Sequence, residues 1–157
     1  YIDAHSNLAK AYMDLKQYEK AIQVYNRLIR LRPKRTQLYN QLGILYVQKG
    51  SYDQAVQQFK QVIKLKPNSP DAFNNIGLAY SKKGRYNQAI EMFERALKLK
   101  PNFLDPYLNL SSLYLKKLGE KQKALHYFKE YLSIAPNNLM SDNLREKVRK
   151  LGNEGKE

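Results

Sequence analysis

Prolines recur in this sequence at a fixed interval of 34 residues, at Pro33, Pro67 and Pro101. Small and aromatic residues keep the same interval in three further columns: Ala21, Ala55 and Ala89; Tyr25, Phe59 and Phe93; Tyr12, Tyr46 and Tyr80. A period of this length is typical of a chain built from copies of one small unit. No copy can bury its apolar face alone, so the stability of such a chain comes from stacking.

The pattern inside each copy predicts two helices. In the third copy, a first apolar stripe at helical spacing is followed by Gly84, which stops the helix as a glycine just past a helix end does. A second stripe runs to Pro101 and ends there, because the residue before a proline avoids helical geometry. The two stripes consist of Phe73, Ile76, Gly77 and Tyr80, and of Tyr86, Ala89, Ile90, Phe93, Ala96 and Leu97. Each helix should have about 14 residues and a length of roughly 21 Å.

The segment from Phe73 to Pro101 resembles the tetratricopeptide repeat consensus, in which a large residue, a Leu-Gly pair, Tyr, Ala, Phe and Pro stand at fixed offsets. The second copy carries the matches Tyr39, Leu42, Gly43, Tyr46, Ala55, Phe59 and Pro67. The first carries Leu8, Ala9, Tyr12, Ala21, Tyr25 and Pro33, and the fourth carries Tyr107, Leu110, Tyr114, Ala124, Phe128 and Pro136. The resemblance implies an all-α fold, an α-solenoid of helix-turn-helix units that forms an open right-handed superhelix.

We expect a single domain over residues 1–151, with repeats at about 2–35, 36–69, 70–103 and 104–138. The fourth repeat has one inserted residue near Lys117 to Gly119, because ten residues separate Tyr114 from Ala124 where nine separate Tyr80 from Ala89. Residues 139–151 predict a capping helix with the apolar stripe Met140, Leu144, Val148 and Leu151; a partner-binding or membrane-surface helix is the alternative. Residues 152–157 should be a disordered tail.

In tetratricopeptide proteins the first helix of each unit lines a concave groove that takes peptides or helices. Carried over to this sequence, one groove row consists of the amides Asn7, Gln41, Asn75 and Asn109. A side-chain amide both donates and accepts hydrogen bonds, so such a row could pair with the backbone of an extended peptide. Alternatively, these amides only bond to their neighbours. The other candidate groove residues are Lys10, Asn40, Ile44, Asn74, Leu78 and Ser112.

A known tetratricopeptide subclass clamps the C-terminal carboxylates of chaperones with lysine, asparagine and arginine side chains. The corresponding positions over the first three units are Ser6, Lys10, Gln41, Asp71 and Asn75. Over the last three units the corresponding positions are Asn40, Ile44, Asn75, Asp105 and Asn109. Neither set has a cation where the clamp has lysine or arginine, and Asp71 and Asp105 would repel a carboxylate. A chaperone tail is therefore not the expected ligand.

The net charge is +14, and many of the basic residues stand at the ends of second helices. They are Arg30, Arg32, Lys34 and Arg35, then Lys64 and Lys66, then Lys98 and Lys100. This edge could meet acidic protein, lipid headgroups or nucleic acid. The helix dipole also favours cations at these positions, and no nucleic-acid-binding module is visible, which disfavours a nucleic-acid partner.

Motifs for catalysis or for cofactor binding are missing from the sequence. There are no cysteines, only two histidines, and no glycine-rich phosphate loop, HExxH or GxSxG motif. We therefore expect a non-catalytic scaffold without cofactor or metal, whose partner is a protein or peptide. The alternatives are a recruiting or regulatory segment of a larger enzyme and a scaffold that self-assembles through the ends of its stack. The chain begins at Tyr1, which suggests a fragment, and the missing secretory signal favours the cytoplasm only slightly.

Overall fold

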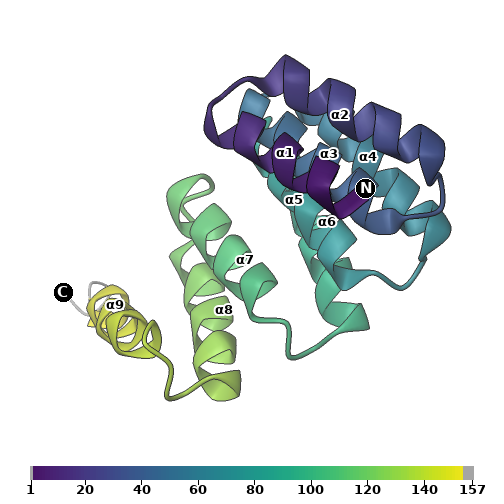
Figure 1. The fold of residues 1–157 in the computed structure, drawn as a ribbon. Coiled ribbons are helices and arrows are strands. Elements are labelled where there is room, and N and C mark those ends of the chain that lie inside the picture. Colours follow the sequence, from purple (N-terminus) through teal and green to yellow (C-terminus); the bar gives the residue numbers. More distant parts are fainter. Residues whose placement is uncertain (1, 154–157) are drawn as a thin grey trace.

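The computed structural model describes residues 2–153, with side chains from Ala4 onward, and this part of the chain forms nine helices and no strand (Figure 1). They are α1 (Ile2–Asp14), α2 (Tyr18–Leu31), α3 (Thr36–Lys49), α4 (Tyr52–Leu65), α5 (Pro70–Lys82), α6 (Tyr86–Leu99), α7 (Leu104–Lys116), α8 (Lys121–Ile134) and α9 (Ser141–Asn153). The predicted all-α solenoid is therefore confirmed, and the helices of the repeats have 13 or 14 residues.

Consecutive helices pack as antiparallel pairs, and the pairs follow one another from α1–α2 to α7–α8 (Figure 1). Each second helix also packs on the first helix of the next pair, as α4 does on α5. First helices of neighbouring pairs contact one another as well, α3 with α5 and α5 with α7. The first helices thus converge on the inner face of the stack, and the second helices lie outside.

Two glycines allow the helices of one pair to approach closely. A β-carbon on Gly43 would lie 2.5 Å from Phe59 Cε1, which is closer than a real methyl group can come. The ring of Phe59 is buried, as is that of Phe93, which covers Gly77 in the same way one repeat later. In the fourth pair Ser111 takes the glycine position, and its hydroxyl donates to the backbone oxygen of Tyr107 at 2.5 Å.

The turns inside the pairs require a left-handed backbone at one position. Gly50, Gly84 and Gly119 adopt it, with φ of 84°, 81° and 67°. In the first pair the same conformation falls on Lys16, at φ 56°. The predicted insertion is confirmed, because four residues join α7 to α8 where three join α5 to α6.

The buried side chains form two clusters along the stack. One extends from Ala9 on α1 to Ala79 on α5, and the other begins at Ala89 on α6 and reaches Leu144 on α9. Tyr80 packs against both clusters. The third pair therefore belongs to both clusters, with α5 in the first and α6 in the second.

Ion pairs join neighbouring repeats at one recurring position. Lys49 Nζ lies 2.8 Å from Glu19 Oε1, and Lys83 Nζ lies 2.5 Å from Asp53 Oδ2. Hydrogen bonding to the lysine lowers the pKa of each carboxyl group below its usual value. At the next junction, 34 residues further on, the acid is replaced by Asn87 opposite Lys117, so this pair cannot form.

Helix α9 closes the far end of the stack. Leu144 is buried, and Val148 and Leu151 pack against the second cluster. The stripe predicted for this helix was wrong at Met140, which precedes α9 and is 49% exposed. Met140 lies in the turn before α9. The first residue of the helix, Ser141, is buried instead, and its hydroxyl donates to the Ala135 oxygen.

The end of α9 also differs from the expectation. Gly152 and Asn153, which were expected in the tail, are helical. No proline follows to stop the helix, and helix ends inferred from sequence are uncertain by one or two residues. The remainder of the predicted tail, residues 154–157, lies outside the described part of the chain.

Candidate peptide-binding groove

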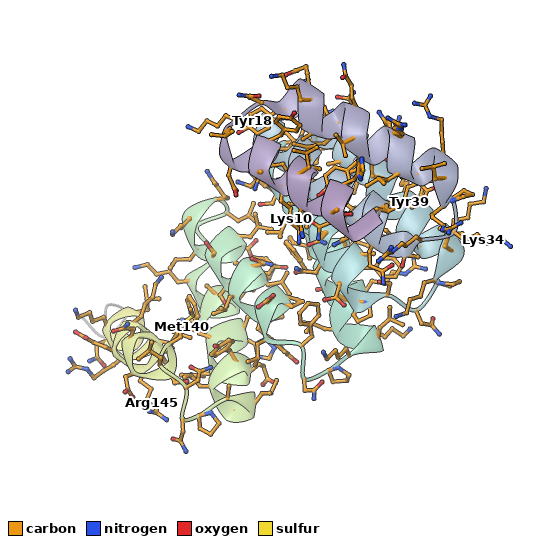
Figure 2. The ribbon with its side chains drawn as sticks, viewed as in Figure 1. Lys10, Tyr18, Lys34, Tyr39, Met140 and Arg145 are labelled. Atoms are coloured by element: carbon orange, nitrogen blue, oxygen red, sulfur yellow. The ribbon has the colours of Figure 1, made fainter. Side chains whose placement is uncertain are left out.

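The ten candidate groove residues all lie on the first helices. Asn7 and Lys10 are on α1, Asn40, Gln41 and Ile44 on α3, Asn74, Asn75 and Leu78 on α5, and Asn109 and Ser112 on α7. The fold therefore places the ten positions on the helices of the inner face. Lys10 is exposed on α1 (Figure 2).

Two of the four row amides bond to the preceding repeat. Asn75 Nδ2 donates to Asn40 Oδ1 at 3.0 Å, and Asn109 Nδ2 donates to Asn74 Oδ1 at 2.9 Å. The donor and the acceptor are 35 residues apart in both cases, so one repeating contact ties α3 to α5 and α5 to α7. An amide has two N–H donors and an oxygen acceptor, so Asn75 and Asn109 each keep unused bonding capacity.

Asn74 was expected to be exposed in the groove, but it is buried. The residue is only 4% exposed, and its side-chain oxygen accepts the bond from Asn109 on α7. The side chains of Asn7 and Gln41 make no hydrogen bond within the described chain; Asn7 is exposed and Gln41 half-buried. In this part of the chain the row amides of the first two repeats therefore make no bond, whereas Asn75 and Asn109 in the last two also join the repeats.

A small cavity of about 200 Å³ opens between α5 and α7. Three of the candidate residues line it, namely Leu78, Asn109 and Ser112, together with Ser81, Lys82, Phe93, Leu113, Lys116 and Lys117. The leucines and the phenylalanine supply an apolar lining, and the amide and the hydroxyl can bond to a backbone. An apolar side chain of a ligand fits this chemistry, with three exposed lysines beside it.

The three lysines and two of the apolar residues that line this cavity were not predicted from the sequence. Lys82 and Lys116 end first helices, where a lysine is expected for the helix dipole alone. Phe93 was expected only in the apolar stripe of its helix, and Leu113 was not singled out. The visible signal was Lys82–Lys83 and Lys116–Lys117, two lysine pairs at the same repeat position.

The outer end of the first pair is also hollowed. A cavity of about 670 Å³ there is lined by Leu8, Tyr12, Lys20, Val24, Arg27 and others. Leu8 is 43% exposed, whereas Leu42, Ile76 and Leu110 at the same repeat position are at most 1% exposed. In later repeats the preceding second helix covers this position.

The described residues contain no group of three His, Cys, Asp or Glu side chains that could hold a metal ion. Within the same part of the chain, every helix is too short or too polar to cross a membrane.

A stack of helix pairs with first helices on its inner face defines an α-solenoid repeat protein. The chain belongs to the tetratricopeptide repeat family. Family models described as TPR repeat match residues 9–50 and 45–84, and models described as tetratricopeptide repeat match residues 70–103 and 104–138. Repeats of this family form protein–protein interaction scaffolds, and this chain is such a scaffold.

Solved structures with the same fold include several of MamA. One is 26% identical with a TM-score of 0.72 and covers 96% of this chain and 81% of the MamA chain. A second is 21% identical with a TM-score of 0.73 and covers 97% and 88%. A third, from Desulfovibrio magneticus RS-1, is 21% identical with a TM-score of 0.72 and covers 85% and 75%. No curated protein sequence matches the chain.

Proposed function

We propose that this chain is non-catalytic and binds an extended peptide or a helix along the inner face of α3, α5 and α7. The observation that carries the proposal is the cavity between α5 and α7, where an apolar lining meets the polar side chains of Asn109 and Ser112. Ile44 on α3 and Leu78 on α5 are half-buried and continue the apolar surface beside the row amides. A ligand backbone would run along this row and place one apolar side chain in the cavity.

The expected affinity is modest. Each amide–backbone hydrogen bond contributes about 0.5–1.5 kcal/mol, and one buried aliphatic side chain adds about 1.5–3 kcal/mol. Several such contacts, reduced by the cost of ordering the ligand, give a dissociation constant of about micromolar. The ligand carries no requirement for a free C-terminal carboxylate, because the clamp positions Ser6 and Asp71 supply no cation.

The test fills the cavity without touching the core. Ser112→Arg places a long side chain into the cavity from its half-buried wall, and Gln57→Arg adds the same group on the exposed outer surface of α4. Both variants and the wild-type chain are used to capture partners from lysate, which are identified by mass spectrometry. Hydrogen exchange then maps the protection that each partner gives.

We expect a partner that Ser112→Arg loses and Gln57→Arg keeps, with protection on α5 and α7. Partners that bind all three chains equally, with protection on α4 or α8, would refute the groove as the binding site.

A second candidate function, self-association through the outer end of the first pair, is favoured by the exposed Leu8 and the cavity around it. Light scattering over a concentration series measures the molar mass. If the end associates, the mass rises with concentration and Leu8→Asp abolishes the rise; a constant monomer mass removes this candidate.

A further inference from the structure

The second helices of the first three repeats end in the same short pattern. Each has an exposed leucine between two cations, directly before the proline that opens the next connection: Arg30-Leu31-Arg32, Lys64-Leu65-Lys66 and Lys98-Leu99-Lys100. The three leucines are 50%, 40% and 39% exposed. We call these nine residues the basic edge. In the fourth repeat the pattern is Ser133-Ile134-Ala135, which carries no charge.

The fold places the three parts of the basic edge side by side. The C-terminal ends of α2, α4 and α6 follow one another along one border of the stack, away from the inner face (Figure 1). Lys34, two residues beyond the first part, points outward at the same border (Figure 2). The edge is therefore a surface distinct from the groove.

The cations of the edge are free to meet a ligand. Within the described chain none of its six basic side chains forms an ion pair; Lys100 lies over the ring of Phe103, 5.2 Å from the ring centre. The nearest acids along the chain are Glu94 on α6, Asp71 at the start of α5 and Asp105 at the start of α7, and none of them forms an ion pair with these cations. The surface is therefore positive in all three parts.

The backbone around the edge is held in place. The hydroxyl of Tyr39 donates to the Pro33 oxygen at 2.9 Å, and the hydroxyl of Tyr107 donates to the Pro101 oxygen at the same distance. These bonds fix the connections that follow the first and third parts of the edge. Little ordering of the backbone is then needed when a large surface binds.

The helix dipole does not account for the whole pattern. It favours the cation in the last turn, such as Lys64 on α4. It does not account for an exposed leucine beside that cation in each of three repeats, since exposing an apolar side chain to water is unfavourable.

We propose that the basic edge binds the surface of an anionic lipid bilayer. The lysines and arginines pair with the headgroups, and Leu31, Leu65 and Leu99 enter the boundary between headgroups and acyl chains. A nucleic acid would use the cations but not the leucines, because its phosphates bind cations and polar donors and its bases stack on aromatic side chains. An extended bilayer also offers headgroups to all three parts at once, which a small acidic peptide does not.

The experiment is sedimentation of the chain with vesicles, one kind made of phosphatidylcholine alone and the other with added phosphatidylserine. The edge variant is Lys64→Gln/Lys66→Gln/Lys98→Gln. The matched control is Lys10→Gln/Lys60→Gln/Lys129→Gln, which has the same net charge and changes only exposed lysines elsewhere. A third variant, Leu65→Asn/Leu99→Asn, keeps every charge of the edge, and thermal melting verifies that each variant is folded.

We expect the wild-type chain to bind only the vesicles with phosphatidylserine and to be released by high salt. The edge variant should lose at least about tenfold in partitioning, and the control less than about twofold. The leucine variant should lose severalfold. If it fails to fold, Leu31→Asn at the most exposed of the three leucines replaces it.

Three results would overturn the proposal. Equal losses in the edge variant and the control would mean that only net charge acts. Full binding by the leucine variant would exclude insertion of the leucines. If the chain binds neither kind of vesicle but binds a DNA duplex through the edge lysines, the edge is a nucleic-acid-binding surface instead.

Discussion

Phe93 occupies the space beside Gly77 so closely that a β-carbon on Gly77 would lie 2.6 Å from Phe93 Cε1. Phe93 is buried and 1% exposed, so its ring cannot move aside without disturbing α6. Gly77→Ala should therefore destabilise the chain by about 1–3 kcal/mol, the usual cost of overpacking a core. Urea unfolding followed by circular dichroism measures the change.

Gly152 supplies the control for that substitution. It lies in α9, and a β-carbon there would meet nothing within 4 Å. Gly152→Ala should leave stability unchanged or raise it by up to about 1 kcal/mol, since alanine is the better helix former. Equal losses from both substitutions would show that the contact with Phe93 does not matter.

Tyr25 carries a buried hydroxyl without a hydrogen-bond partner in the described chain. The same repeat position holds Phe59 and Phe93 in the next two units, and burial raises the pKa of Tyr25. Tyr25→Phe removes an unsatisfied polar group, whose burial typically costs about 1–3 kcal/mol, and should raise the melting temperature. Calorimetry of the variant measures the shift.

Tyr131 is the control for Tyr25, because the same Tyr→Phe substitution there removes a hydroxyl that has a hydrogen-bond partner. It is equally well buried, but its hydroxyl accepts a hydrogen bond from Asn138 Nδ2 at 2.8 Å. Tyr131→Phe should lower stability by about 1 kcal/mol. A loss of stability in Tyr25→Phe as large as that in Tyr131→Phe would contradict the prediction.

Lys16 adopts the left-handed conformation that glycine takes in the three later repeats. A side chain there is disfavoured by roughly 1–2 kcal/mol, and part of the gain from glycine is lost to the greater freedom of the unfolded chain. Lys16→Gly should therefore stabilise the chain by about 1 kcal/mol or less in thermal unfolding. The reverse change, Gly84→Lys, should destabilise it, and a stabilising effect there would refute the explanation.

Stability should fall at acid pH because of the ion pairs between repeats. The pKa values of Glu19 and Asp53 are lower in the folded chain than in the unfolded chain, through hydrogen bonds to Lys49 and Lys83. The contribution is present above the unfolded pKa values of about 4 and is lost as the pH falls through the folded ones. Glu19→Gln/Asp53→Asn should reduce the slope of melting temperature against pH in this range.

The control for this slope is Asp14→Asn/Asp105→Asn. Both acids are exposed and neither forms an ion pair in the described chain, so their replacement should leave the slope nearer to that of the wild type. If both double variants flatten the curve equally, the dependence reflects net charge rather than the two ion pairs.

The bond between Asn109 and Asn74 should appear as a coupling between the two positions. A double-mutant cycle with Asn109→Ala and Asn74→Ala should give an interaction energy of about 0.5–1.5 kcal/mol in urea unfolding. Asn26 is exposed on α2, so Asn109→Ala combined with Asn26→Ala should be additive. Additivity in both cycles would mean that the amide bond contributes nothing.

Much of the fold was predictable because each signal occurs several times. The turn at Gly84 is ambiguous alone, but Gly50 repeats it one unit earlier, and prolines mark every boundary between repeats. The insertion before α8 was visible for the same reason, as a break in a regular spacing. Met140 had no counterpart in another repeat, and there the prediction failed.

The candidate site was predictable in position but not in its internal bonds. That Asn75 lies on an inner helix follows from its place in the repeat. Its partner Asn40 lies one unit earlier, and their distance depends on how far each repeat rotates against the next. That rotation is set by packing between repeats and is not encoded at any single repeat position. The burial of Asn74 could not be foreseen for the same reason.

The bond from Asn109 to Asn74 makes the wall of the proposed groove also a link between α5 and α7. A ligand that takes the hydrogen donated to Asn74 must leave that buried oxygen without a partner or supply another donor. A ligand that accepts only the second hydrogen of Asn109 leaves the bond between Asn109 and Asn74 intact. Ligands of similar affinity would therefore differ in their effect on the curvature of the whole stack. A ligand that breaks the bond would free α5 and α7 to change their relative angle, and a ligand that leaves it intact would keep that angle.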